Sequence, residues 1–350
     1  MTGARANSGA QRHLPATDRL RWFRRAAGCA ALLALVVVVV GAWVRLTDAG
    51  LGCPDWPGCY GQLHPAQVAD IASINAASPH KPFDYAKALH EMVHRYIATL
   101  LGALILGLAV YAWRHRRDPA QPRVLPWMVL AIVIGQGVFG ALTVLWKVKP
   151  IIVTIHLLGG LTTLSLLWWL SLPPEQRAMA APERALRRWW LAGFAMLVLQ
   201  LFLGGWTSTN YAAVACPDLP TCQGSWWPER NYREAFVLWR GLGIDYEGGV
   251  LSSPARTAIH HTHRLGAVLV AAMLWLLAGL AWRRGKTPAV RLAAAGVAAA
   301  VCLQWLIGAN LILQGFPLWL GTSHNAGAAV LLLSMVTLAR YLWPRAGSSV

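Results

Sequence analysis

Residues 41–65, GAWVRLTDAGLGCPDWPGCYGQLHP, recur in altered form at residues 204–228 as GGWTSTNYAAVACPDLPTCQGSWWP. The two segments share the pattern Cys-Pro-Asp-x-Pro-x-Cys-x-Gly. Each has a Trp ahead of this pattern and a Pro behind it at matching distances. Similarity that returns at a fixed period indicates an internal duplication. The sequence therefore predicts that the chain contains two copies of one structural unit.

Further matches extend the repeat along the chain. They pair EMVHR (91–95) with HHTHR (260–264), HLLGG (156–160) with HNAGA (324–328), and Gln136 and Gly140 with Gln304 and Gly308. The spacing between the two aligned histidines is nearly the same in both halves. The duplication therefore includes the histidines as well as the cysteine segment.

The composition is that of a membrane protein. Of 350 residues, 56% are hydrophobic and only 13% are charged, and the mean hydropathy is +0.45. A spanning helix needs about 20 apolar residues. Eight stretches satisfy this, at about 28–46, 86–113, 124–146, 150–172, 188–209, 257–282, 290–313 and 319–343. The first stretch lacks an A-x-A-like cleavage site after it, so it is interpreted as a retained helix and not a signal peptide.

These stretches predict an all-α membrane protein with eight transmembrane helices in two pseudo-symmetric four-helix bundles. Each half has an even number of helices, so the halves form a parallel tandem repeat. The predicted organisation is a cytoplasmic N-terminal tail (1–27), an N-terminal bundle (28–172), a cytoplasmic linker (173–187), a C-terminal bundle (188–343) and a cytoplasmic tail (344–350).

The charge distribution predicts the orientation in the membrane. The chain has 31 Lys and Arg against 14 Asp and Glu. Most of the basic residues lie in the two tails and in alternate connections, which is the positive-inside pattern with both termini cytoplasmic. The net charge of +17 is therefore a signal of topology. Nucleic-acid binding is disfavoured, because the positive-inside pattern already accounts for the basic excess.

The segment HEMVHR (90–95) contains His-Glu-x-x-His, a pattern that binds zinc in metalloproteases. The repeat argues against that interpretation, because Ile259 stands at the position of His90 and His260 at that of Glu91. A zinc site also needs a third protein ligand. An intramembrane zinc protease is therefore kept only as an alternative.

Four histidines, His94, His156, His263 and His324, are predicted at one depth in the second and fourth helices of each half. Ionisable groups inside a membrane are costly and are usually functional. Two histidines on facing helices of a bundle favour bis-histidine ligation of haem. In this interpretation Arg95 and Arg264 pair with haem propionates. The alternative is that each histidine only hydrogen-bonds another helix.

Four of the six cysteines occupy matching positions in the two repeated segments. These are Cys53 and Cys59 in the first loop and Cys216 and Cys222 in the second. A disulfide within each pair is expected on an oxidising side of the membrane. A redox role of the thiols remains the alternative.

Together, the Glu-x-x-His-Arg motif at 91–95, the four histidines and the CPDWPGC loop (53–59) resemble the haem A synthases of bacteria and mitochondria, over about residues 28–343. The resemblance implies oxidation of a methyl group of haem O to the formyl group of haem A, through hydroxylated intermediates, for a terminal oxidase. It also implies that His94 and His156 bind the substrate haem O, while His263 and His324 bind a permanent haem b.

The resemblance further implies a bacterial plasma-membrane enzyme with an electron acceptor that the sequence does not identify. It implies a complex with the prenyltransferase that makes haem O, and self-association is a further expectation. Glu91 is the catalytic candidate, because it precedes His94 on the same helical face and has no carboxylate counterpart in the second half. A dihaem electron-transfer cytochrome would need the four histidines but not Glu91. A haem transporter or chaperone would release haem unmodified.

Overall fold

The computed structural model describes residues 16–175 and 181–344, which form α-helices, two 3-10 turns and connecting loops. Within these ranges, eight helices are long and apolar enough to cross a membrane. They are α1 (Ala16–Leu46), α3 (Tyr85–Arg114), α4 (Leu125–Leu145), α5 (Pro150–Ser171), α6 (Ala181–Thr209), α8 (Ser253–Arg284), α9 (Pro288–Leu313) and α10 (Leu318–Leu342). The prediction of an all-α protein with eight such helices is confirmed.

The largest boundary error concerns the first helix. We expected it to begin near residue 28, and it begins at Ala16. The segment 16–27 is rich in Arg and Ala, which are good helix formers, and it contains no Pro or Gly. The helix therefore continues beyond its apolar part, and its 31 residues span about 46 Å against a hydrocarbon core of about 30 Å. Residues 1–15 and 345–350 of the predicted tails, and 176–180 of the predicted linker, lie outside the described residues.

Two other helices also begin earlier than expected. α6 begins at Ala181 and α8 at Ser253, whereas we expected 188 and 257. The start of α8 is fixed by Ser252, whose side chain accepts a hydrogen bond from the backbone N–H of Ala255. The loops also contain elements that hydropathy did not predict. These are α2 (Ile71–Ala77), α7 (Tyr232–Ala235) and the 3-10 turns Pro65–Gln67 and Ala213–Ala215.

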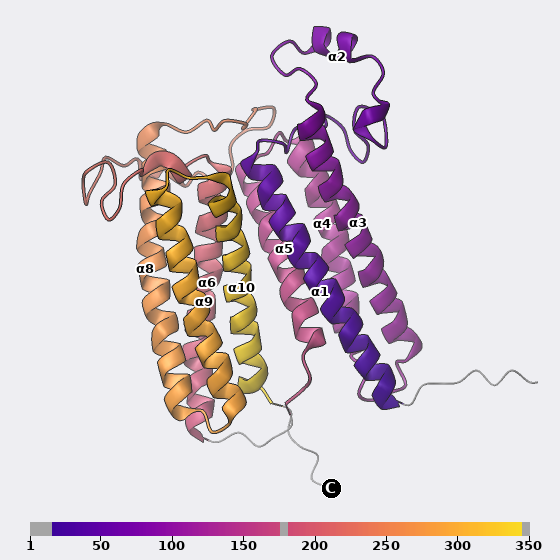
Figure 1. Cartoon of the computed structure of the whole chain (residues 1–350), viewed down its shortest axis with the longest axis vertical. Helices are drawn as coiled ribbons and strands as arrows, with labels where there is room; N and C mark the ends of the chain where they lie inside the picture. The colour runs from indigo at the N-terminus through magenta and orange to yellow at the C-terminus, as the bar shows by residue number, and fades with distance from the viewer. Residues whose placement is uncertain (1–15, 176–180, 345–350) are drawn as a thin grey trace, which may run out of the picture.

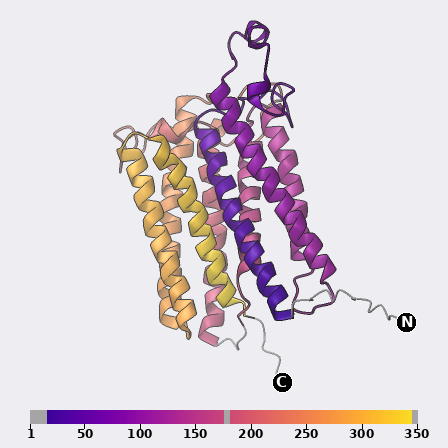
Figure 2. The ribbon, with the colours of Figure 1, turned by 45° about the vertical axis from the view of Figure 1, so that its right-hand side comes forward.

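The spanning helices form two groups of four (Figure 1). Helices α1, α3, α4 and α5 pack together, as do α6, α8, α9 and α10, and the groups meet where α1 and α5 contact α10 and α6. The start of α1 and the end of α10 lie at the same end of the molecule (Figure 2). The long loops 47–84 and 210–252 lie at the opposite end, which we call the loop end (Figure 1).

The apolar core is continuous across the two groups. Phe23, Leu164, Leu197, Leu274 and Met335, which come from five different helices, belong to one cluster and are at most 2% exposed. Large apolar side chains on the outward faces remain exposed, as expected where a helix faces lipid tails as apolar as the side chains themselves. The core therefore fixes the two groups against each other, and the histidines lie on helices that this packing positions.

Polar contacts join the two groups at the loop end. Arg45, at the end of α1, donates to the backbone carbonyl of Ser208 at 2.6 Å and pairs with Asp48 at 3.2 Å. Its guanidinium lies over the ring of Tyr211, 4.1 Å from the centroid. The Tyr211 hydroxyl donates to Asp48 at 2.7 Å. Arg45 therefore connects the first loop to the end of α6.

Two lysines add further contacts between the halves. Lys81 lies 2.6 Å from both Asp245 and Glu247. Lys149 is only 1% exposed, and its ammonium donates to the carbonyl of Gly241 at 3.2 Å and lies 3.4 Å from the ring centroid of Trp239. The loop of the second half is therefore anchored on the first half.

We expect Arg45→Met to lower the free energy of unfolding by about 1–3 kcal/mol, because it leaves a partly buried carbonyl and a carboxylate without their charged donor. The measurement is the unfolding midpoint of the purified protein in detergent. Arg21→Met is the matched control, since the Arg21 side chain is 65% exposed and its partner Asp18 is itself 45% exposed, and it should change this free energy by less than about 0.5 kcal/mol. Equal effects of the two substitutions would contradict the assigned role of Arg45.

Candidate functional site

Each of the four histidines lies against a glycine of a neighbouring helix. A Cβ added to that glycine would lie 2.9 Å from Cε1 of the ring for Gly41 and His94, 3.6 Å for Gly140 and His156, 3.2 Å for Gly204 and His263, and 3.0 Å for Gly308 and His324. Three of these distances are too short for any side chain at the glycine without a shift of the ring. The glycines therefore let four imidazoles pack directly on helix backbone, in the same way in both halves.

In the second half, the two histidines face one cavity. The rings of His263 and His324 lie 6.5 Å apart between centroids, at an interplanar angle of 81°. Both line a cavity of about 1040 Å³, which is also lined by Gly204 and Gly308. At a metal–nitrogen distance of about 2 Å, as for imidazole on zinc, two rings at this spacing can bind one ion from opposite sides.

Glutamines accompany the histidines of the second half. The side-chain amide of Gln200 lies 3.0 Å from Nδ1 of His263 and donates to its backbone carbonyl at 2.9 Å. The amide of Gln304 lies 3.2 Å from Nδ1 of His324 and donates to that residue's carbonyl at 3.0 Å. Both imidazoles therefore have a polar neighbour in addition to the glycine behind them.

The histidines of the first half differ from those of the second in the polar neighbours of their ring nitrogens. His94 and His156 lie within electrostatic range of each other, but the Nδ1 atom of each is buried without a hydrogen-bond partner. The residue aligned with Gln200 is Val37, which cannot donate a hydrogen bond. Buried polar atoms normally have a partner. Two unpartnered imidazole nitrogens in one bundle therefore indicate a ligand site.

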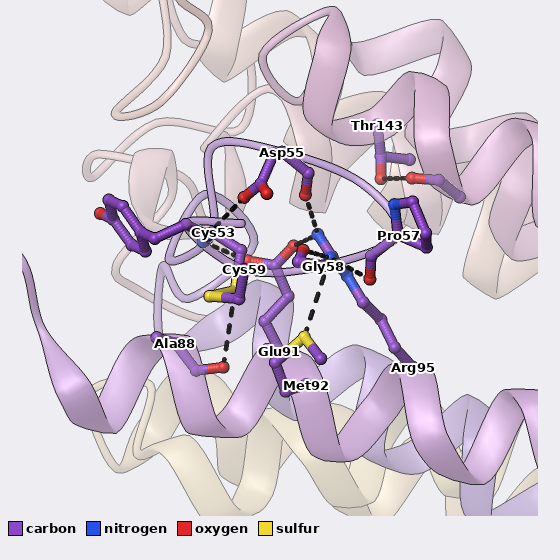
Figure 3. A network of polar contacts seen from close by, with 12 residues as sticks. Cys53, Asp55, Pro57, Gly58, Cys59, Ala88, Glu91, Met92, Arg95 and Thr143 are labelled. Carbon is purple, nitrogen blue, oxygen red and sulfur yellow. Dashed lines mark hydrogen bonds and ion pairs between the residues drawn. A yellow bond between two sulfur atoms is a disulfide. The ribbon is translucent and has the colours of Figure 1, made fainter. Parts of the chain in front are cut away.

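Glu91 connects the helix of His94 to the first cysteine loop (Figure 3). Its carboxylate is buried and accepts from the backbone N–H of Cys53 at 2.9 Å and from Arg95 at 2.6 Å. Arg95 in turn donates to the carbonyls of Asp55 at 3.0 Å and Pro57 at 3.1 Å. The glutamate and arginine of the 91–95 motif therefore fix the loop above the histidine.

His260 occupies the matching place in the second half. Its Nδ1 accepts from the backbone N–H of Cys216 at 3.3 Å, and Nε of Arg264 lies 3.3 Å from its Nε2. Arg264 also donates to the carbonyls of Cys216 at 2.6 Å, Asp218 at 2.7 Å and Thr221 at 2.8 Å. The second half therefore keeps the same loop contacts with a neutral acceptor, and the carboxylate is present only in the first half.

The cysteine pairing is as predicted. Cys53 is bonded to Cys59, and Cys216 to Cys222. Within each loop an aspartate accepts from two successive backbone N–H groups, Tyr60 and Gly61 for Asp55, and Gln223 and Gly224 for Asp218. The hydroxyl of Thr221, together with these N–H groups, holds the pKa of Asp218 at about 2. The aspartate is therefore charged over the physiological pH range and keeps the turn closed.

The structure does not bring the His-Glu-x-x-His residues together as a metal site. The carboxylate of Glu91 points to the loop, and the ring of His90 contacts the edge of Trp43 at 6.3 Å between centroids. Within residues 16–175 and 181–344, no group of three or more His, Cys, Asp or Glu side chains lies close enough to share a metal ion. Nothing in the described chain therefore favours the zinc-protease alternative.

Sequence reasoning missed the glutamine and glycine neighbours of the histidines as functional residues. The matching of Gly140 with Gly308 in the repeat was a usable signal, because a glycine retained in both copies beside a buried ring implies close approach. Gln200 gave no such signal, since Val37 replaces it in the first half.

The fold and the site define a multi-pass membrane protein with two pairs of glycine-backed histidines below disulfide-bonded loops. A model of the COX15-CtaA family, described as cytochrome oxidase assembly protein, matches residues 24–336. The chain belongs to this family.

Individual relatives are consistent with this family membership. A heme A synthase of Shewanella oneidensis is 38% identical over 337 residues, which are 95% of this chain and 99% of that protein. Heme A synthases of Halalkalibacterium halodurans and Rhizorhabdus wittichii are 24% and 27% identical, over 88% and 87% of this chain and 93% and 90% of their own lengths.

Replacing Arg264 with Met should release the second cysteine loop, because three backbone carbonyls lose a charged donor. Since such a bond contributes about 1.5–3 kcal/mol, amide hydrogen exchange in residues 216–225 should accelerate at least about tenfold. Arg230→Met is the control, because Arg230 contacts the rings of Trp227 and Tyr232 but donates to no carbonyl of that loop. Unchanged exchange in Arg264→Met would show that the guanidinium does not hold the loop.

Proposed function

We infer that this chain is a haem A synthase, an oxidoreductase that converts a methyl group of haem O to the formyl group of haem A through hydroxylated intermediates. The observation that carries this inference is the agreement of the family with the site. A chain related over nearly its whole length to heme A synthases contains four partly buried, glycine-backed histidines on facing helices.

We assign haem b to His263 and His324. The donor set fits, because two imidazoles facing one cavity are a common pair of axial ligands. The cavity of about 1040 Å³ is large enough for a macrocycle, and the glycines behind the rings let the imidazoles pack on helix backbone. When bound, this haem would supply one-electron transfer. Gln200 and Gln304 would keep the two rings in place.

The substrate haem O is assigned to His94 and His156. Their unpartnered Nδ1 atoms support a ligand in the first bundle, and the missing glutamine at Val37 leaves His94 less constrained than His263. A ring without a second fixed partner can turn away from a metal ion more readily. This suits a site from which the product must leave.

Glu91 is proposed as the catalytic carboxylate. It lies one turn before His94 on α3, and one of its oxygens accepts from Cys53 N–H while the other pairs with Arg95. Its position and charge suit it to accept a proton from the reacting methyl carbon or from water there. Arg95 orients the carboxylate and holds the loop that excludes solvent. A contact of Arg95 or Arg264 with a haem propionate stays a prediction.

The finer architecture is part of the proposal. We propose that residues 28–172 and 188–343 are parallel repeats, with the first bundle for substrate and the second for haem b. The concentration of basic residues at the end opposite the loops supports a bacterial plasma-membrane protein with both termini cytoplasmic. A complex with the haem O-forming prenyltransferase, an electron acceptor and self-association stay predictions.

Glu91→Gln tests the assignment of the carboxylate. The amide keeps an acceptor for Cys53 N–H but cannot take a proton, so conversion of haem O to haem A should fall about 10²–10⁴-fold while haem b content stays at the wild-type level. The readout is the ratio of haem A to haem O in pigments extracted from the purified protein and its membranes.

The matched control is His260→Gln, which places the same side chain at the corresponding loop contact of the second half. It should retain conversion. Wild-type conversion in Glu91→Gln would limit Glu91 to holding the loop. If neither the wild-type protein nor the variant formed haem A, a dihaem electron-transfer cytochrome would be favoured instead.

A further inference from the structure

Three arginines, Arg45, Arg256 and Arg264, line the large cavity that His263 and His324 face. Two of them are already engaged. Arg45 pairs with Asp48 and donates to the carbonyl of Ser208. Arg264 uses three of its N–H groups on three loop carbonyls, and its Nε lies 3.3 Å from His260. These two guanidiniums therefore hold the protein together at the loop end.

Arg256 differs from Arg45 and Arg264 in its side-chain contacts. It is partly buried on the first turn of α8, and its side chain makes no hydrogen bond or ion pair with any residue in 16–175 or 181–344. It also lines a smaller hollow of about 280 Å³ beside Tyr211 and Gln223. The one acid that lines the large cavity, Asp48, is bound to Arg45 and Tyr211. A half-desolvated cation without a counter-charge calls for an anionic ligand.

The position of Arg256 relative to His263 defines that ligand further. The two residues are seven apart on α8, so they share one face of the helix, with Arg256 about 10.5 Å closer to the loop end. Both line the same cavity. A ligand that contacts both must have a metal-binding centre in the apolar interior and an acidic group at the edge nearest the loops.

We propose that Arg256 binds a carboxylate of the porphyrin that His263 and His324 ligate, with the guanidinium fork on the two carboxylate oxygens. The proposal rests on the proposed haem b site. It places the main propionate contact at Arg256, whose five side-chain N–H groups have no partner among the described residues. Arg264, by contrast, has one such N–H group left. Lys87 stands seven residues before His94 at the matching place of the first half. A lysine there supplies a positive charge but cannot form the paired hydrogen bonds that a guanidinium makes with a carboxylate. This weaker contact suits a ligand that must be released.

The test compares haem b with its dimethyl ester, in which both carboxylates are neutral. The full-length protein is used in a His94→Ala background, so that only the second half binds, and each porphyrin is titrated into the apo-protein by absorbance. The protein with Arg256 should bind haem b at least about tenfold more tightly than the ester, because charge-assisted hydrogen bonds contribute about 1.5–3 kcal/mol each. Arg256→Gln should weaken haem b binding by a similar factor and leave the ester unchanged.

Arg256→Lys should give an intermediate preference for haem b and tests the same contact if the glutamine variant folds poorly. Arg230→Gln, outside the cavity lining, should keep the full preference. Equal weakening of haem b and ester in Arg256→Gln, or no change in either, would overturn the proposal. Failure of both porphyrins to bind the protein with Arg256 intact would instead overturn the haem b site itself.

Discussion

The packing of four imidazole rings on helix backbone is the contact on which the rest of the site depends. At three of the rings a glycine on the adjacent helix is needed, because a Cβ would lie 2.9 Å from the ring at Gly41, 3.2 Å at Gly204 and 3.0 Å at Gly308. The close approach brings the helices of each bundle together at the histidines, and in the second half both rings line the large cavity. In the proposed function, ligand binding and helix packing therefore use the same four positions.

The two halves share one framework but differ in the residues placed on it. In both, the residue four before an arginine accepts from a cysteine N–H, and the arginine binds carbonyls of the disulfide loop. The acceptor is Glu91 in one half and His260 in the other, so only one half has a carboxylate. Gln200 accompanies His263, whereas Val37 leaves His94 without this partner. These differences support the proposal that the first half carries the reaction and the second half retains its haem.

Much of this arrangement could be predicted from the sequence. Spanning helices can be recognised from the length and hydropathy of apolar stretches. The internal repeat identified the four histidines and predicted the pairing of the cysteines. The start of α1 was missed because an arginine-rich helix continues past the apolar segment. The contacts of Arg264 were missed because its partners are backbone carbonyls, which no residue pattern identifies. The sequence could not show that Arg256 lacks a hydrogen-bond partner among the described residues, because this depends on the contacts of all three arginines that line the cavity.

The pigments extracted from the purified protein and from two alanine variants test the central claim most directly. We predict that the wild-type protein contains low-spin haem, with haem b and some haem O or haem A on extraction. His263→Ala should lose haem b, while His94→Ala should keep it and lose haem O and haem A. Stoichiometric zinc without haem, or loss of haem b to the same extent in both variants, would contradict the assignment of the two halves.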